Sequence, residues 1–432
     1  MTEASTESHQ SVAALDTSSI HRDAEERLVH RIEELVRKEQ EHSFYIVDLQ
    51  DVRNRAAFFK SLFPQITPFY ALKCNSDLHV LRALAELGYV GFEVSSADEL
   101  ELARDVMLSS PMRSTELRDI VFSNPYKSSR ALELVESGCA VRALVVDSAD
   151  ELRRVSGTIR RCRTEGARPE VHLRIASDET CVEFPMNSKF GARPDEVLPL
   201  LQLASELGTA ITGVSFHVGS GASGSAAFTR SIHRATKVCE LARQHGLTLI
   251  RTLNLGGGFP CIETSLLHAF ARDIHDSLPN QLGVGVIAEP GRFIVESSHT
   301  LVVQVIGRRR AKSVQSAHGD GVMDDHWQYY MGDGMYGSFM DVALQKVVFA
   351  PCAVVKGGTV LHMRSFIARG GSFALYKSTL WGPTCDSIDC IGTFELPALS
   401  VGDWLVFERM GAYTRSLTTS FNSIRKPTVY YQ

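Results

Sequence analysis

The feature that most constrains the fold of this chain is a series of eight short apolar runs, rich in β-branched residues, that alternate with helical stretches. The runs span residues 68–73, 90–95, 120–123, 143–147, 170–175, 213–218, 252–256 and 284–289. Strands that alternate with helices form parallel β/α units, and eight such units predict a closed (β/α)8 barrel of the TIM type. We therefore assign residues 55–298 to this barrel, whose usual size is roughly 250 residues.

The rest of the chain has the pattern of a second, all-β domain, a β-barrel or sandwich. Apolar runs at residues 302–306, 347–355, 363–368 and 404–407 are joined by Gly-rich turns, and residues 43–49 also predict a strand. We assign residues 21–54 and 299–432 to this domain, including a helix predicted over residues 22–40. Residues 1–20 predict a disordered tail, and the polar residues 308–326 a mobile loop. The fold class is thus α/β plus all-β.

The composition of the 432-residue chain argues against several classes of protein. A net charge of −5 gives no reason to expect a nucleic-acid partner, and no apolar run reaches the length that spans a membrane. The nine cysteines lack the spacing of a disulfide scaffold or a zinc site, so we expect reduced thiols and no metal. The first residues lack a basic start followed by an apolar run, so we expect no signal peptide and a cytoplasmic protein.

Polar residues and glycines gather at the C-terminal ends of the predicted strands, where such a barrel has its active site. They are Lys73 after the first strand, Glu93 in the second, Arg174 in the fifth, His217 with Gly219, Ser220 and Gly221 in the sixth, Gly256, Gly257 and Gly258 in the seventh, and Glu289 with Arg292 in the eighth. A lysine beside carboxylates, a glycine run that lets backbone N–H groups approach a phosphate, and an arginine favour a phosphorylated aldehyde cofactor. Pyridoxal phosphate (PLP) fits, because it needs a lysine for a Schiff base and an acid against its pyridine nitrogen.

A dinucleotide site is the alternative interpretation of the sixth strand end. Residues 219–224 fit G-x-G-x-x-G, follow a predicted strand, and precede Glu240 by about 20 residues. This unit is the sixth in a series of β/α units, however, and no separate nucleotide-binding domain surrounds it. A dinucleotide would also leave Lys73 and Glu289 without a role.

Seven segments resemble those of the eukaryotic-type ornithine decarboxylases, which are fold-type III PLP enzymes. They are PFYALKCN (68–75), HVGSG (217–221), GGGFP (256–260), EPGR (289–292), DGMYGSF (333–339), WGPTCD (381–386) and GAY (411–413). The match runs in order from about residue 43 to residue 430. It implies a PLP-dependent carboxy-lyase that converts L-ornithine to putrescine and CO2 in polyamine biosynthesis.

The resemblance implies a role for each matching residue of the cofactor site. Lys73 holds the cofactor as a Schiff base and later helps to move protons, Glu289 keeps the pyridine nitrogen protonated, and His217 stacks on the ring. The phosphate ligands are Ser220, Gly257, Gly258, Arg292 and Tyr413, while Glu93 belongs to the cofactor site with Arg174 and Glu99 behind it.

The resemblance also implies a head-to-tail homodimer with shared active sites. Cys385 would return a proton to the carbanion after CO2 leaves, Asp386 would bind the distal amino group of the substrate, and Tyr336 would line the shared site. Lys189 and Asp389 match a pair that bridges that interface. A regulator of the antizyme type is a further candidate partner.

Two positions depart from the family pattern. The second strand end has Phe92-Glu93 where the family usually has Phe-Asp. Gln345 stands where the family places a substrate-binding aspartate, so one of two charge-assisted contacts to the distal ammonium is lost. That loss would weaken ornithine binding by about ten- to a hundredfold. Asp341 lies four residues from this position and is a candidate replacement.

Three hypotheses follow from these matches and departures. The chain is an ornithine decarboxylase, or a related enzyme that acts on a different or modified amino acid of a specialised pathway, or a non-catalytic paralogue that binds partners as antizyme inhibitors do. The usual substrate of the family that the chain resembles favours the first hypothesis, whereas Gln345 favours the second. The third is the least favoured, because Lys73, Glu289, Arg292 and Cys385 are all present.

Overall fold

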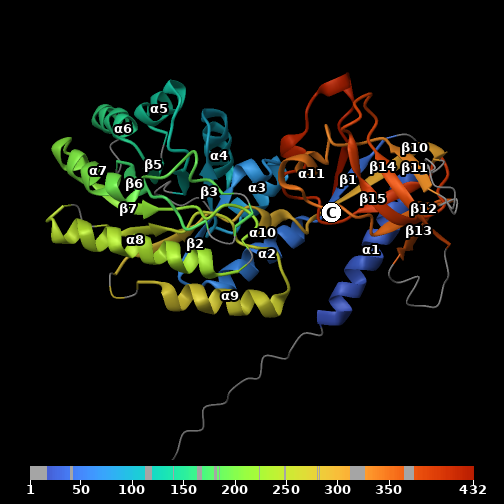
Figure 1. Cartoon of the computed structure of the whole chain (residues 1–432), viewed down its shortest axis with the longest axis horizontal. Helices are drawn as coiled ribbons and strands as arrows, with labels where there is room; N and C mark the ends of the chain where they lie inside the picture. Colours follow the sequence, from blue (N-terminus) through green and yellow to red (C-terminus); the bar gives the residue numbers. More distant parts are fainter. Residues whose placement is uncertain are drawn as a thin grey trace, which may run out of the picture.

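The computed structural model describes most of the chain. The described residues are 17–38, 42–111, 119–139, 141–162, 168–179, 182–183, 185–222, 224–247, 250–279, 281, 283–311, 326–363 and 374–432. They form two lobes, a barrel of strands ringed by helices and a lobe built on a mixed sheet (Figure 1).

The barrel lobe contains eight parallel strands that close on themselves. They are β2 (Ile66–Ala71), β3 (Gly91–Val94), β4 (Ile120–Phe122), β5 (Ala143–Val146), β6 (Glu170–Arg174), β7 (Ile211–Ser215), β8 (Thr252–Asn254) and β9 (Gly285–Ala288). Each strand pairs with its neighbours in chain order, and β9 pairs with β2 through Ile66 and Val286. Every predicted barrel run coincides with one of these strands, so the (β/α)8 prediction is confirmed.

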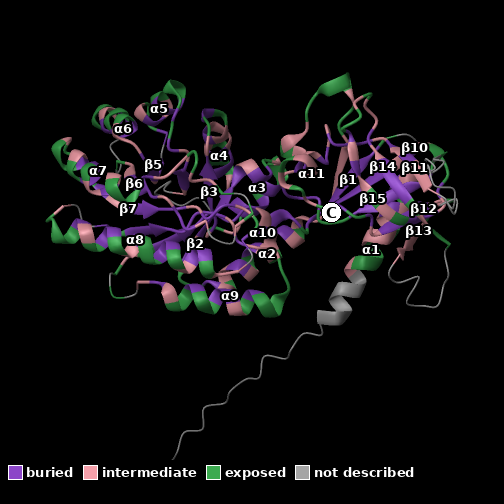
Figure 2. Ribbon diagram, in the orientation of Figure 1, coloured by how far each residue is buried: buried purple, intermediate pink, exposed green. Residues whose placement is uncertain are grey.

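Helices cover the outside of the barrel, with buried strands inside and exposed helix faces outside (Figure 2). They are α2 (Leu49–Leu62), α3 (Leu78–Ala85), α4 (Ala97–Ser109), α5 (Ser129–Glu136), α6 (Ala149–Arg161), α7 (Pro194–Glu206), α8 (Ala226–Gln244), α9 (Thr264–Ser277) and α10 (Arg292–Val295). Several begin at a Ser or Asp whose side chain accepts a backbone N–H of the first turn, as Ser96, Ser128 and Ser148 do. The barrel interior is filled by a cluster that includes Phe69, Val145 and Ile287.

The second lobe is built on a nine-stranded mixed sheet. Its strands are β1 (Phe44–Val47), β10 (His299–Ala311), β11 (His326–Met331), β12 (Ala353–Lys356), β13 (Thr359–His362), β14 (Leu375–Trp381), β15 (Cys390–Pro397), β16 (Trp404–Phe407) and β17 (Thr428–Tyr431). β1 precedes the barrel in sequence, yet it pairs with β10 and with β17 in this sheet. Helix α1 (Thr17–Lys38) packs Ile32 and Leu35 against Phe44 and Trp404 of the same sheet.

Several predicted boundaries differ from the structure. The strand predicted over residues 347–355 is wrong for residues 347–352, because β12 begins at Ala353 and a short helix, α11 (Met340–Gln345), precedes this stretch. The predicted tail is wrong for residues 17–20, which belong to α1, while residues 1–16 lie outside the described residues. The predicted loop over residues 308–326 is wrong at both ends, which pair as β10 and β11, and residues 312–325 lie outside the described part. Residues 364–368, which were predicted as part of a strand over residues 363–368, also lie outside the described residues.

Within the described ranges, no helix has both the length and the apolar character needed to cross a membrane. The same residues contain no cluster of three or more His, Cys, Asp or Glu side chains that could bind a metal ion.

Candidate active site

A cavity of about 300 Å³ lies at the C-terminal end of the barrel strands. Its lining includes Lys73, His217, Ser220, Gly257, Gly258, Glu289, Arg292, Gln345 and Tyr413, all of which the sequence predicts as site residues. Gln345 and Tyr413 come from the second lobe, so both lobes build the wall. We call this space the barrel-end cavity.

Lys73 and Glu93 form an ion pair beside this cavity. Lys73 lies in a single 3-10 turn directly after β2, and its Nζ is 2.6 Å from Oε2 of the buried Glu93. The Ser95 hydroxyl donates to the other oxygen of Glu93 at 3.0 Å. Burial by itself lowers the pKa of Lys73, but Glu93, Tyr413 and Glu289 outweigh it and hold that pKa above its ordinary value. The Glu93 carboxylate therefore positions the Lys73 amine.

Glu289 is held at the bottom of the site by two hydrogen bonds. It follows β9 directly, and its Oε1 accepts from Asn254 Nδ2 at 2.7 Å and from the Ser123 hydroxyl. Burial, followed by the charge of Glu93, raises the pKa of Glu289, while Lys73, Ser123 and Asn254 oppose the increase. Ser123 and Asn254 were not among the site residues predicted from the sequence. The sequence feature that could have identified them is a polar residue inside, or at the end of, an apolar run that predicts a strand.

His217 is a neutral imidazole in this structure. Its Nδ1 accepts the backbone N–H of Gly219 at 2.9 Å, so the ring carries its proton on Nε2. Burial, with the nearby charges of Arg174 and Lys73, holds the pKa of His217 well below its usual range. Arg174, at the end of β6, is buried with its guanidinium 4.9 Å from the Phe190 ring centre.

Glu99, which the resemblance places behind the cofactor, is linked to Glu93 through Ser95. It belongs to the first turn of α4, and its Oε2 accepts the backbone N–H of Ser95 at 2.7 Å. Burial, then the charge of Glu93, raises the pKa of Glu99. Ser95 thus binds Glu99 through its backbone and Glu93 through its hydroxyl, which fixes the two acids relative to each other.

The glycine run after β8 has a shape that only glycine allows. A Cβ on Gly257 would lie 2.9 Å from both the Glu289 carbonyl oxygen and His217 Nε2. Gly258 has φ +98°, and a Cβ there would lie 2.3 Å from the Gly219 carbonyl oxygen. Bare backbone therefore lines this side of the cavity. Such a cradle, with Lys73 and the anchored Glu289, fits PLP, whose phosphate suits closely approaching N–H groups.

Arg292 faces the same cavity from the first turn of α10. Its Nη2 is 2.9 Å from Oδ2 of Asp341, and its guanidinium carbon is 5.2 Å from the centre of the Tyr413 ring. Asp341, the candidate replacement for the acid missing at position 345, is thus engaged by Arg292. Gln345 lines the cavity, and the acid one turn before it on α11, Asp341, is paired with Arg292.

Cys385, Asp386 and Tyr336 form a separate cluster that does not line the barrel-end cavity of this chain. The Tyr336 hydroxyl donates to Asp386 Oδ2 at 2.5 Å. This hydrogen bond lowers the pKa of Asp386, and it raises the pKa of Tyr336. Cys385 is exposed, and its sulfur accepts from Asn422 Nδ2 at 3.7 Å.

Asp389, which the resemblance places in an intersubunit pair with Lys189, is buried within this chain. Its Oδ1 accepts the backbone N–H of Met335 at 2.6 Å, and its Oδ2 accepts the Thr384 hydroxyl at 2.7 Å. The carboxylate therefore ties the loop that carries Tyr336 to the loop that carries Cys385 and Asp386.

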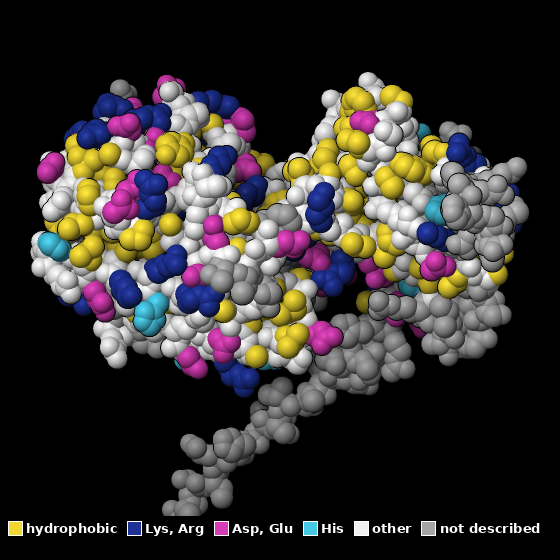
Figure 3. Space-filling view, in the orientation of Figure 1, with side chains coloured by type: hydrophobic (Ala, Val, Ile, Leu, Met, Phe, Trp, Pro, Cys, Tyr) yellow, Lys and Arg dark blue, Asp and Glu magenta, His cyan; other side chains and the backbone are white. Residues whose placement is uncertain are grey.

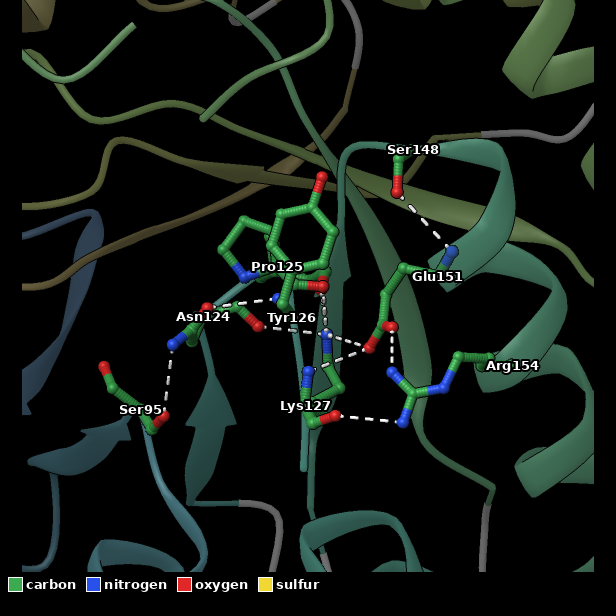
Figure 4. A network of polar contacts seen from close by, with 9 residues as sticks. Ser95, Asn124, Pro125, Tyr126, Lys127, Ser148, Glu151 and Arg154 are labelled. Carbon is green, nitrogen blue, oxygen red and sulfur yellow. Dashed lines mark hydrogen bonds and ion pairs between the residues drawn. The ribbon is translucent and has the colours of Figure 1, made fainter. Parts of the chain in front are cut away.

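The buried Lys127 fixes the segment after β4 through contacts with Asn124, Pro125 and Glu151 (Figure 4). Ser123 immediately precedes this segment in the chain. Lys127 Nζ donates to the carbonyl oxygens of Asn124 at 3.0 Å, Pro125 at 3.1 Å and Val145, and it lies 3.6 Å from Oε1 of the buried Glu151. Burial lowers the pKa of Lys127 to about 8, against the opposing effect of Glu151. This network was not predicted from the sequence, because a lysine in a loop normally indicates a solvated side chain.

Comparisons with known proteins agree with this geometry. A family model described as "Pyridoxal-dependent decarboxylase, pyridoxal binding domain" matches residues 49–296. Antizyme inhibitor 2 of Xenopus laevis is 35% identical over 407 residues, which are 93% of this chain and 83% of that protein. Ornithine decarboxylase of Mus musculus is 30% identical over 419 residues, or 94% of this chain and 84% of that protein. The crystal structure of the Paramecium bursaria Chlorella virus arginine decarboxylase has a TM-score of 0.80 and 29% identity, and the match covers 94% of this chain and all of that one.

Proposed function

The chain belongs to the family of pyridoxal-dependent decarboxylases, and from this premise we propose that it removes the carboxylate of L-ornithine to give putrescine and CO2. The observation that carries the proposal is the set of Lys73, Glu93 and Glu289 around a glycine cradle at the barrel end. PLP is the cofactor of this family, and Lys73, Ser220, Gly257, Gly258, Arg292 and Tyr413 are the residues proposed to hold it.

The proposed chemistry divides between the cofactor and the side chains. Bound PLP supplies an electron sink for the electron pair that remains when CO2 leaves. Glu289, whose Oε1 accepts from Ser123 and Asn254, would stabilise a proton on the pyridine nitrogen of the bound cofactor. The Lys73 amine moves protons near the reacting carbon, and the Glu93 carboxylate 2.6 Å away keeps it in place. The neutral ring of His217, which lines the cavity, would contact the bound cofactor without adding charge.

A second substrate class is supported by Gln345. The amide lines the barrel-end cavity where an ornithine-specific enzyme of this family is expected to have an acid, and Asp341 is occupied by Arg292. A substrate with a different or modified distal group would not need that acid. This alternative keeps the same cofactor and the same bond cleavage.

We further infer that two chains share each active site in a homodimer. Cys385, Asp386 and Tyr336 do not line the cavity of their own chain, which supports their use in the cavity of a partner. Two large apolar side chains are exposed beside these residues: Phe421, whose ring centre is 4.4 Å from that of Tyr336, and Ile388, whose backbone N–H donates to Asp386. Hydrophobic side chains are also visible on the surface of the second lobe in Figure 3. Contiguous exposed apolar surface of this kind often marks a face that a partner covers. In the dimer Cys385 would protonate the product carbon, and Asp386 would bind a distal ammonium group.

Two further proposals concern regulation and location. The similarity to antizyme inhibitor 2 supports a regulator of the antizyme type as a candidate protein partner. A cytoplasmic location and a role in polyamine biosynthesis are proposed with the ornithine decarboxylase relatives as support.

The proposed function is tested by measuring CO2 release from a panel of amino acids. Purified protein is supplied with PLP and with ornithine, lysine, arginine, diaminobutyrate or longer analogues. Release of CO2 from ornithine is the expected result. Release only from other amino acids would show that the substrate belongs to the second class, with a different or modified distal group. An absence of release from every amino acid would overturn the decarboxylase proposal and leave the non-catalytic alternative.

The Gln345→Asp variant tests the specificity argument, and Gln345→Asn is the matched control because Asn has the shape of Asp without its charge. The restored carboxylate is expected to raise kcat/KM for ornithine by about ten- to a hundredfold over the Asn variant. Equal kcat/KM values for the two variants would show that position 345 does not bind the distal ammonium.

A further inference from the structure

The guanidinium of Arg292 lies between two carboxylates, of which Asp341 is the main partner. Nη2 is 2.9 Å from Asp341 Oδ2, whereas Nη1 is 3.7 Å from Glu296 Oε2. The other oxygen of Glu296 is already bound by Arg409, whose Nε donates to it at 2.7 Å. Arg292 therefore has one short contact, to Asp341 on α11, and one long contact, to a carboxylate shared with another arginine.

The environment of Asp341 is costly for a carboxylate. Its side chain has no exposed surface, and among the described residues Oδ1 has no hydrogen-bond partner. A buried charge with half of its acceptor capacity unused destabilises a fold unless it has a strong partner. The one strong partner that it has here is Arg292. This points to a role for Asp341 in orienting the guanidinium of Arg292.

The helix α11 links this pair to the substrate wall. Asp341 and Gln345 are one helical turn apart, so they lie on the same face of α11. Gln345 lines the barrel-end cavity and Asp341 holds an arginine that lines it. On this helix Asp341 thus binds Arg292, while Gln345 lines the cavity beside it.

We propose that Asp341 is a positioning residue for cofactor binding, because it holds the Arg292 guanidinium toward the cavity and prevents it from turning onto Glu296. Asp341 engages Nη2, and the Tyr413 ring 5.2 Å from the guanidinium carbon limits rotation of the plane. The N–H groups left over are then preset for a phosphate. This inference rests on the proposed role of Arg292 as a phosphate ligand.

The test compares PLP with pyridoxal, which has the same ring and aldehyde but no phosphate. Each is titrated into the cofactor-free protein and followed by near-visible absorbance. We expect Asp341→Ala to lower PLP affinity by about ten- to a hundredfold and to leave pyridoxal affinity unchanged. Asp341→Asn keeps an oxygen that accepts from Nη2, so its PLP affinity should stay within about threefold of the unmodified protein. Asp276→Ala, which removes an exposed acid on α9, is the control and should change neither affinity.

Arg292→Ala separates the inference from the proposal on which it depends. If Arg292→Ala leaves PLP affinity unchanged, the proposed phosphate site is wrong. If Arg292→Ala weakens PLP binding and Asp341→Ala does not, the inference about Asp341 is overturned. An equal loss for PLP and pyridoxal in Asp341→Ala would also overturn it, because the effect would not pass through the phosphate. The double variant should bind PLP no more weakly than Arg292→Ala alone.

Discussion

His299, the first residue of β10, makes the stability of this protein depend on pH in a way that can be calculated. The imidazole is fully buried, its Nε2 accepts from Asn75 Nδ2 at 3.1 Å, and its Nδ1 is 2.8 Å from the Ser298 hydroxyl. Burial, reinforced by the charge of Arg415, lowers the pKa of His299 to about 3. A proton on Nε2 would also remove the acceptor that Asn75 uses, two residues after Lys73.

The sign and the size of the effect follow from the two pKa values. In the unfolded chain an imidazole has a pKa of about 6.5, so between pH 6.5 and 3 the unfolded state binds a proton that the folded state does not. The contribution of His299 to stability is therefore complete above about pH 6.5 and is lost as the pH falls. At pH 5 the loss is about 1.5 pH units times 1.36 kcal/mol, or about 2 kcal/mol.

The variant His299→Gln removes the titrating group and keeps an oxygen that can accept from Asn75. We expect the stability advantage of the unmodified protein over this variant to shrink by about 2 kcal/mol between pH 7.5 and pH 5. Urea unfolding of both proteins at several pH values measures this difference, and titrations shared by both cancel. An advantage that is the same at pH 7.5 and pH 5 would show that His299 titrates in the folded protein as it does in the unfolded chain.

Three further predictions follow from contacts at the barrel end. Gly257→Ala should abolish PLP binding in an absorbance titration, because its Cβ would lie 2.9 Å from the Glu289 carbonyl oxygen, and a folded variant that binds PLP normally would refute the cradle. Lys127→Met should lower the unfolding free energy by about 3 kcal/mol in urea titrations, since it leaves buried carbonyls and the buried Glu151 without their amine; a change below about 0.5 kcal/mol would contradict this. Ser123→Ala should weaken PLP binding by about tenfold, because the Glu289 carboxylate loses a charge-assisted donor, and unchanged affinity would mean that Asn254 alone suffices.

The barrel was predictable from the sequence because its strands are short apolar runs that alternate with helices along the chain. The stretch over residues 347–352 shows where the same reasoning fails. It is apolar, but Val348 is 75% exposed and Pro351 has no N–H to donate to a neighbouring strand. An apolar run at the surface and an apolar run in a core look alike in one sequence, since burial depends on what else packs there.

The part of the candidate site that was predictable from the sequence is the part formed by residues at the ends of the barrel strands. Lys73 and Glu289 end strands of a barrel, and topology alone brings such positions together. The contacts of Ser123 with Glu289 and of Asp341 with Arg292 join residues far apart in the chain, and they depend on side-chain directions that no sequence pattern encodes. The site role of Cys385 and Asp386 was predicted from the resemblance alone. Neither residue lines the barrel-end cavity of its own chain.

The placement of β1 has a consequence for how the chain is made. This strand, Phe44–Val47, is fully buried and apolar, yet its partners β10 and β17 both follow the barrel in sequence. About 250 residues separate the end of β1 from the start of β10, and at 5–20 residues per second a ribosome needs roughly 10–50 s to produce them. During that interval the barrel segments can fold, while β1 remains an exposed apolar strand without its pairing partners and can pair with other chains. The second lobe is therefore expected to form last, and chains halted within the barrel should be the ones that aggregate or recruit chaperones.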